Sequence, residues 1–156
     1  MQQVNTPLNE VMRLSADHGL GFSLQDATST NRYIDPALAE KYVACFERHR
    51  PTRSAVDIFA VPNSEECPIR IGEEGPRVET PSVIGTSVRT AAQLLTEKGY
   101  HPHQISVESD RPLESKTKRS DHNWNLQVCE QSIPAGTEFT ADAKLQIIAR
   151  IECSDN

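Results

Sequence analysis

The chain has 156 residues and a formal net charge of −6 at pH 7, and 37% of its residues are hydrophobic and 5% aromatic. This length fits one ordinary domain or two small ones. An acidic chain is a poor candidate for nucleic-acid binding, which needs cations gathered on one face. No apolar run approaches the ~18 residues of a membrane span, and no basic-then-apolar signal peptide opens the chain. We therefore expect small cores in a chain that is either cytosolic or trimmed of a leader.

The first half of the chain predicts a helix followed by three strands. Thr6 is the expected cap of the helix and Pro7 its first residue, where the missing N–H costs nothing. An apolar stripe begins at Leu8, and Gly19 is expected to end the helix. Asp35 is the expected cap of an extra helical turn. The predicted strands are 22–24, 42–46 and 55–61.

The segment 69–78 is the expected join between two units, 1–68 and 79–156. It carries two glycines and a proline among charged residues, a composition typical of a linker or turn. Ile69–Ile71 could still add a short edge strand.

The second half predicts the same order of elements. Thr86 or Ser87 is the expected helix cap, and Gly99 is expected to end the helix. The turn at 134–137 should join the last two strands, with Gly136 allowing a positive φ. The predicted strands are 104–107, 124–129 and 145–151.

The four cysteines support a repeat. They lack CxxC spacing, which disfavours a zinc ribbon, and they allow three disulfide connectivities. Cys45 and Cys67 are 22 residues apart and Cys129 and Cys153 are 24 apart. In each unit the first cysteine lies at the end of one predicted strand, before the turn, and the second lies past the returning strand. Each pair would thus staple two strands. Strict alternation does not place Cys129 and Cys153 on one face, so a bulge or frayed strand end is expected. The alternative is four free thiols in a cytosolic protein.

The predicted fold class is α+β. Each of two tandem small domains should have one helix packed on a three-stranded antiparallel sheet, because apolar residues alternate along the strands and recur at helical spacing in the helices.

The second unit resembles a PASTA domain, the module of penicillin-binding proteins and bacterial serine/threonine kinases. The resemblance covers about 75 residues and rests on "TPSVIGTSVRTAAQLLTEKGY" and "VCEQSIPAGTEF". The arrangement of Trp124, Cys129 and Cys153 is similar to that of disulfide-containing PASTA domains in exported actinobacterial proteins. The first unit lacks the Pro-x-x-x-Gly opening, so we interpret it as a degenerate or N-terminally trimmed copy.

The resemblance implies a non-catalytic, extracytoplasmic module of the cell envelope that binds peptidoglycan fragments. The alternative is a scaffold that contacts another envelope protein and has no small-molecule ligand. No catalytic motif, cofactor motif or complete metal-ligand set is recognised in the sequence.

Three stretches are candidates for ligand or metal contact. The basic loop could bind an anionic ligand, with an aromatic ring offered to a sugar; the alternative is a solvated loop and a core tryptophan. An acidic stretch could bind a cation, although a solvated linker is the simpler interpretation. His101 and His103 could form half of a metal site, and an exposed loop is again the simpler interpretation. The residues of the basic loop are Lys116, Lys118, Arg119 and Trp124, and those of the acidic stretch are Glu65, Glu66, Glu73, Glu74 and Glu79.

Overall fold

The computed structural model describes residues 2–109 and 126–153. The chain divides into two compact units, unit 1 (Met1–Pro76) and unit 2 (Arg77–Asn156). Residues 69–76 belong to unit 1, because the Gly72 N–H donates to the Ala27 carbonyl and the Ser29 N–H donates to the Glu73 carbonyl, both at 2.8 Å.

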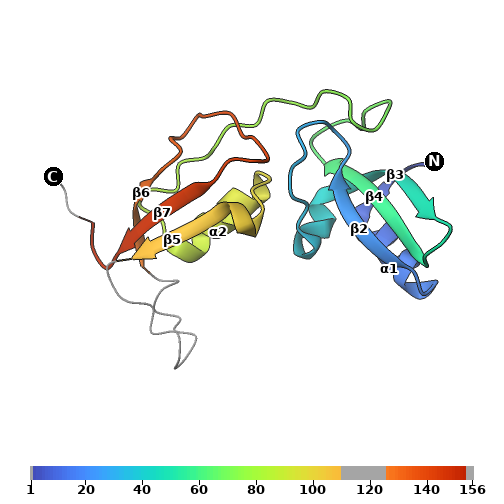
Figure 1. The fold of residues 1–156 in the computed structure, drawn as a ribbon, viewed down its shortest axis with the longest axis horizontal. Coiled ribbons are helices and arrows are strands. Elements are labelled where there is room, and N and C mark those ends of the chain that lie inside the picture. Colours follow the sequence, from blue (N-terminus) through green and yellow to red (C-terminus); the bar gives the residue numbers. More distant parts are fainter. Residues whose placement is uncertain (1, 110–125, 154–156) are drawn as a thin grey trace. The chain divides into compact units, whose positions relative to one another are not determined.

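Unit 1 is a four-stranded sheet with one α-helix (Figure 1). The strand order is β1-β3-β4-β2, with β2 parallel to β4 and the other pairs antiparallel. Leu8 and Val11 of the helix are buried against Val56, Ile58 and Ala60 of β4. The elements in chain order are β1 (Gln2–Pro7), α1 (Leu8–Asp17), β2 (Gly21–Asp26), the 3₁₀ helix η1 (Pro36–Lys41), β3 (Tyr42–Arg50) and β4 (Ala55–Pro62).

In its described residues, 77–109 and 126–153, unit 2 is a three-stranded sheet with one α-helix. The strand order is β5-β7-β6, with β5 parallel to β7 and β6 antiparallel to β7. Its core joins Val88, Ala91 and Leu95 of the helix to Leu145 and Ile147 of β7. The elements in chain order are α2 (Val88–Glu97), the 3₁₀ helix η2 (Pro102–Gln104), β5 (Ile105–Ser109), β6 (Gln127–Gln131) and β7 (Leu145–Arg150).

The α+β class is confirmed, and unit 2 has the predicted three strands. The prediction is wrong in that unit 1 has four strands and neither sheet is wholly antiparallel. In each unit the first strand after the helix pairs in parallel with the last strand, because the chain crosses over between them. Alternation of apolar residues shows which face of a strand is buried, and it does not show which strand lies beside it or in which direction.

The N-terminal segment is a strand, where the sequence predicted only a helix start. The Thr6 Oγ1 donates to the Val4 carbonyl at 2.9 Å, so it does not cap the helix. Pro7 is the cap residue of α1 and not its first residue. Asn5 has a positive φ of 48° where the ladder between β1 and β3 shifts register, which hides the strand from pattern analysis.

The two units share one topology. The order β2-β4-β3 in unit 1 matches β5-β7-β6 in unit 2, including the one parallel pair. The residues before α2 take the place of β1, since the Val128 N–H donates to the Thr86 carbonyl and the Gly85 N–H donates to the Val128 carbonyl, both at 2.8 Å. In both units, therefore, the segment that leads into the helix pairs with the outer edge of one strand, β3 in unit 1 and β6 in unit 2.

Both predicted disulfides are present, Cys45–Cys67 and Cys129–Cys153. The strand ladders shift register between Ala44 and Phe46 and between Val128 and Glu130. Cys45 and Cys129 thus each lie at a bulge. For Cys129 the sequence predicted either a bulge or a frayed strand end, and the structure has a bulge.

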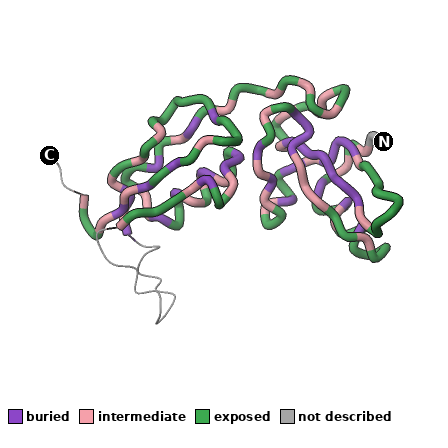
Figure 2. Tube along the Cα trace, in the orientation of Figure 1, coloured by how far each residue is buried: buried purple, intermediate pink, exposed green. Residues whose placement is uncertain are grey.

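Burial differs between the two last strands. In β4 every residue from Val56 to Val61 is buried, whereas β7 alternates between buried and more exposed residues (Figure 2). The second face of β4 is covered at one end, where Phe59 and Val61 contact Cys67 and Ile71. No helix in the two described ranges has both the length and the hydropathy that a membrane span requires.

Candidate functional site

The turn of unit 2 that resembles the family motif is bonded to the segment that opens the unit. The Thr80 N–H donates to the Thr137 carbonyl and the Gly136 N–H donates to the Thr80 carbonyl, both at 2.8 Å. Gly136 has a φ of 89°, a conformation that favours glycine. Thr80 also shares a 2.7 Å hydrogen bond with the buried Tyr100 hydroxyl. The motif therefore joins the turn between β6 and β7 to the segment that opens unit 2.

Gln131, another motif residue, joins three parts of unit 2. Its Oε1 accepts from the Val83 N–H at 2.8 Å, and its Nε2 donates to the carbonyls of Pro81 and Ile133 at 3.1 and 2.8 Å. These bonds satisfy the amide, because a side-chain amide offers two donors and one carbonyl oxygen. Gln131 serves the fold and leaves little capacity for a ligand.

The hydroxyls at the start of α2 also bond to the protein. The Ser87 Oγ accepts from the Thr90 N–H at 3.1 Å, which confirms Ser87 as the helix cap. The Thr86 Oγ1 donates to the Val83 carbonyl at 2.7 Å.

The two histidines after α2 are part of a local turn. The His101 Nδ1 accepts from the His103 N–H at 3.0 Å, and the two rings stack with centroids 4.5 Å apart. Within the part of the chain that the structure describes, no group of three or more His, Cys, Asp or Glu residues could hold a metal ion.

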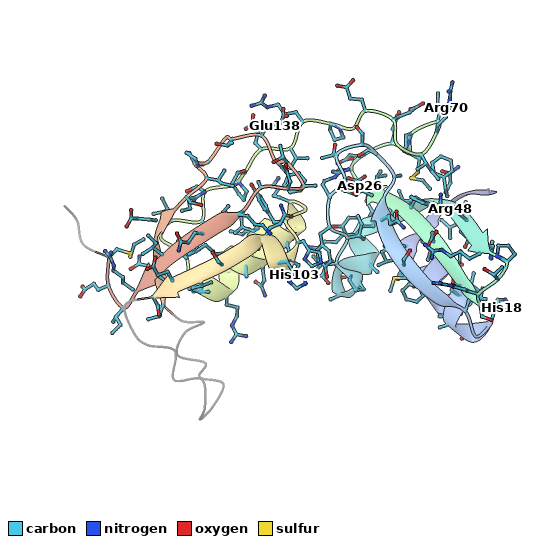
Figure 3. All side chains as sticks on the ribbon, viewed as in Figure 1. His18, Asp26, Arg48, Arg70, His103 and Glu138 are labelled. Carbon is cyan, nitrogen blue, oxygen red and sulfur yellow. A yellow bond between two sulfur atoms is a disulfide. The ribbon has the colours of Figure 1, made fainter. Side chains whose placement is uncertain are left out.

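The acidic stretch contributes to a buried ion cluster in unit 1. Arg32 contacts the Glu65 carboxylate at 2.7 and 2.9 Å and the Asp26 carboxylate at 2.7 Å, where β2 ends (Figure 3). Burial alone would lower the pKa of Arg32, but hydrogen bonds to Glu65 and Asp26 outweigh it and raise the pKa above the ordinary value. Glu73 accepts from the Ile69 N–H at 3.2 Å. Glu65 and Glu73 therefore bind the protein itself.

A second charged cluster lies on the sheet of unit 1, and we call it the arginine face: Ser23, Arg48, Arg50, Asp57 and Phe59. Arg48 and Arg50 both donate to the carboxylate of Asp57 (Figure 3 labels Arg48). The Ser23 Oγ donates to the same carboxylate at 2.8 Å. The Arg48 guanidinium lies 5.1 Å from the centroid of the Phe59 ring, within cation–π distance.

The hydrogen bonds of the arginine face keep the carboxyl group of Asp57 ionised. Burial would raise the pKa of Asp57, but hydrogen bonds from Ser23, Arg50 and Arg48 outweigh it and lower the pKa below the ordinary value. Asp57 is thus a buried anion. The sequence prediction missed this cluster, although a signal was present. Arg48 and Arg50 lie at alternate positions of one strand, and alternate residues of a strand share a face of the sheet.

The predicted ligand-binding residues Lys116, Lys118, Arg119 and Trp124 lie outside the described residues. The structure therefore places only the framework that carries this loop, between β5 and β6.

The comparison with protein families agrees with the motif residues quoted for unit 2. The PASTA domain family model matches residues 78–149. No curated protein matches the chain. Among solved structures, the chain is similar to the three-PASTA-domain region of a Ser/Thr kinase from Staphylococcus aureus, with 15% identity and a TM-score of 0.36. That match covers 97% of this chain and 65% of the other, just under two thirds of its length. Residues 78–149, most of unit 2, therefore match the PASTA domain family.

Proposed function

We propose that the chain is a non-catalytic, extracytoplasmic module of two tandem PASTA-like domains that binds peptidoglycan fragments of the cell envelope. The PASTA match at residues 78–149 carries the proposal, because this family is generally associated with cell-wall proteins. Two disulfides favour an oxidising compartment, since such bonds are rare in the cytosol.

Unit 1 enters the proposal as a divergent second domain. It repeats the strand order of unit 2, the single parallel pair, and a disulfide that begins at a bulged cysteine. Strand β1 supports this interpretation, because it occupies the position of the segment that opens unit 2.

The proposed contacts in unit 2 are the basic loop and its neighbouring tryptophan. Lysine and arginine would bind the carboxylates of a peptide stem. The Trp124 ring would stack on the face of a sugar.

The test is calorimetry with soluble muropeptides and retention on purified sacculi. Replacement of the three loop cations by alanine should abolish both signals. A control variant with the same change of charge should bind as the parent does. Loss of binding in both variants would mean that net charge, and not the basic loop, explains the effect. Capture of a specific envelope protein without retention on sacculi would favour a scaffold. The loop substitutions are Lys116→Ala, Lys118→Ala and Arg119→Ala, and the control substitutions are Arg77→Ala, Lys98→Ala and Lys144→Ala.

A further inference from the structure

Equivalent positions of the two sheets carry different chemistry. In unit 1, Arg48 lies opposite Asp57, and Asp57 lies beside Ser23 of β2. In unit 2 the equivalent neighbours are Ser132 and Gln146: the Ser132 N–H donates to the Gln146 carbonyl at 2.9 Å, and the Ser132 Oγ accepts from the Gln146 N–H at 2.8 Å. Because unit 2 fills this position with neutral side chains, the shared topology does not require the charge cluster of unit 1.

The arginine face presents more positive charge than it neutralises. Each arginine uses its Nε and Nη2 on the single carboxylate, at 3.0–3.2 Å. A guanidinium has five N–H donors, so each arginine keeps donors that point away from Asp57. The side chains of Arg48 and Arg50 are 50% and 45% exposed, while that of Asp57 is 2% exposed. Two partly exposed cations are thus held in place by one buried anion.

The arginine face is a positively charged surface on a unit whose other residues are negatively charged overall. The hairpin segment 46–57, which includes Asp57, carries three arginines, one glutamate and one aspartate, a net charge of +1. The rest of unit 1 carries four basic and nine acidic residues, a net charge of −5. An anionic partner would be attracted to the hairpin and repelled elsewhere on the unit, which sets its position.

The spacing of the arginines indicates the form of the partner. Arg48 and Arg50 are two residues apart on β3, so their backbones are separated by about 6.8 Å, while their guanidinium groups both reach the Asp57 carboxylate. Acidic residues at alternate positions of an extended peptide repeat at the same interval. The planar guanidinium matches a carboxylate in a two-bond contact.

We propose that the arginine face of unit 1 binds an extended acidic segment of a partner protein, with carboxylates at alternate positions. Arg48 and Arg50 contact the carboxylates, and Asp57, Ser23 and Phe59 position the two guanidinium groups. This interaction does not depend on peptidoglycan binding by unit 2.

The experiment measures fluorescence anisotropy of a labelled peptide of four Ser-Glu repeats, titrated with the full chain. The reference peptide has the same composition with its glutamates in one block. The repeating peptide should bind more tightly, and binding should weaken as salt rises from low to physiological concentration. Block and repeat peptides binding equally would overturn the spacing argument.

Matched variants separate this site from general charge. Arg48→Lys with Arg50→Lys keeps the charge and a partner for Asp57 but loses the guanidinium fork, so affinity should fall about fivefold or more. Arg13→Gln removes one charge from α1, on the other face of the sheet, and should leave affinity unchanged. Equal effects of the two variants, or no effect of the lysine pair, would refute the proposal.

Two further outcomes decide the ligand. Inorganic polyphosphate displacing the peptide more readily than unlabelled peptide does would overturn the carboxylate assignment. The variant lacking Lys116, Lys118 and Arg119 should still bind the peptide. Loss of peptide binding in that variant would instead place the site in unit 2.

Discussion

Removing the disulfide of unit 1 should cost more stability than removing that of unit 2. The two loops are nearly equal, with sequence separations of 22 and 24. Chain entropy assigns about 3.4 kcal/mol to each of them. The difference comes from packing: Cys45 is 0% exposed and belongs to an apolar cluster with Phe46 and Phe59, whereas Cys129 and Cys153 are half-buried.

The double alanine variant of unit 1 therefore pays a cavity cost in addition to the lost constraint. We expect about 5 kcal/mol for Cys45→Ala with Cys67→Ala, since a partly relaxed cavity adds roughly 1–2 kcal/mol. For Cys129→Ala with Cys153→Ala we expect the entropic value alone, about 3.5 kcal/mol.

Native-state hydrogen exchange on the full chain would measure each unit separately. Amides of β3 and β4 report on unit 1, and amides of β6 and β7 report on unit 2. An equal loss in both units would refute the packing argument. A loss below about 1 kcal/mol in either unit would refute the loop-entropy estimate itself.

Three further perturbations test single contacts. The pKa of Asp57 lies below its ordinary value, so its contribution to stability is complete above the unfolded pKa of ~3.9 and is lost as pH falls toward the folded pKa; urea titrations at pH 3–7 should show a flatter profile for Asp57→Asn. Gln131→Ala strands the Val83 N–H and should cost about 1–3 kcal/mol by chemical denaturation, and no loss would mean that water replaces the amide. Gly75→Ala would press a methyl group against the Thr28 side chain, and thermal unfolding should show a loss of about 1–3 kcal/mol; an unchanged midpoint would mean that the loop moves aside.

Local signals in the sequence predicted local structure well. Ser87 caps α2 because a hydroxyl before an apolar helical stripe can accept an orphan N–H. Gly99 has a φ of 113°, the left-handed conformation expected just past a helix. The parity conflict between Cys129 and Cys153 predicted an irregularity, and the ladder has a bulge there. Each of these features depends on residues close in the chain.

Long-range pairing could not be predicted in the same way. The parallel pairing of β2 with β4 joins residues 34 positions apart in the chain, and side-chain alternation is the same for either strand direction. The arginine face was missed for a related reason. Arg48 has the same sequence parity as buried residues of β3, and only the sheet register, shifted between Ala44 and Phe46, places it opposite Asp57.

Unit 1 should tolerate the neutral residues that unit 2 carries at the equivalent positions, if the shared topology does not need the charge cluster. The variant that makes this change is Arg48→Ser with Asp57→Gln. Asp57→Gln alone leaves Arg48 and Arg50 without their shared anion, and Arg48→Ser alone leaves Asp57 with one guanidinium. In a double-mutant cycle, the double variant should lose less stability than the sum of the single losses, by about 1–3 kcal/mol.

The folded double variant should also fail to bind the repeating acidic peptide, because one of its two guanidinium forks is gone. A double variant that unfolds would mean that unit 1 needs these charges to fold. The neutral residues of unit 2 would then no longer argue for a ligand, because the arginines would be explained by the buried carboxylate alone.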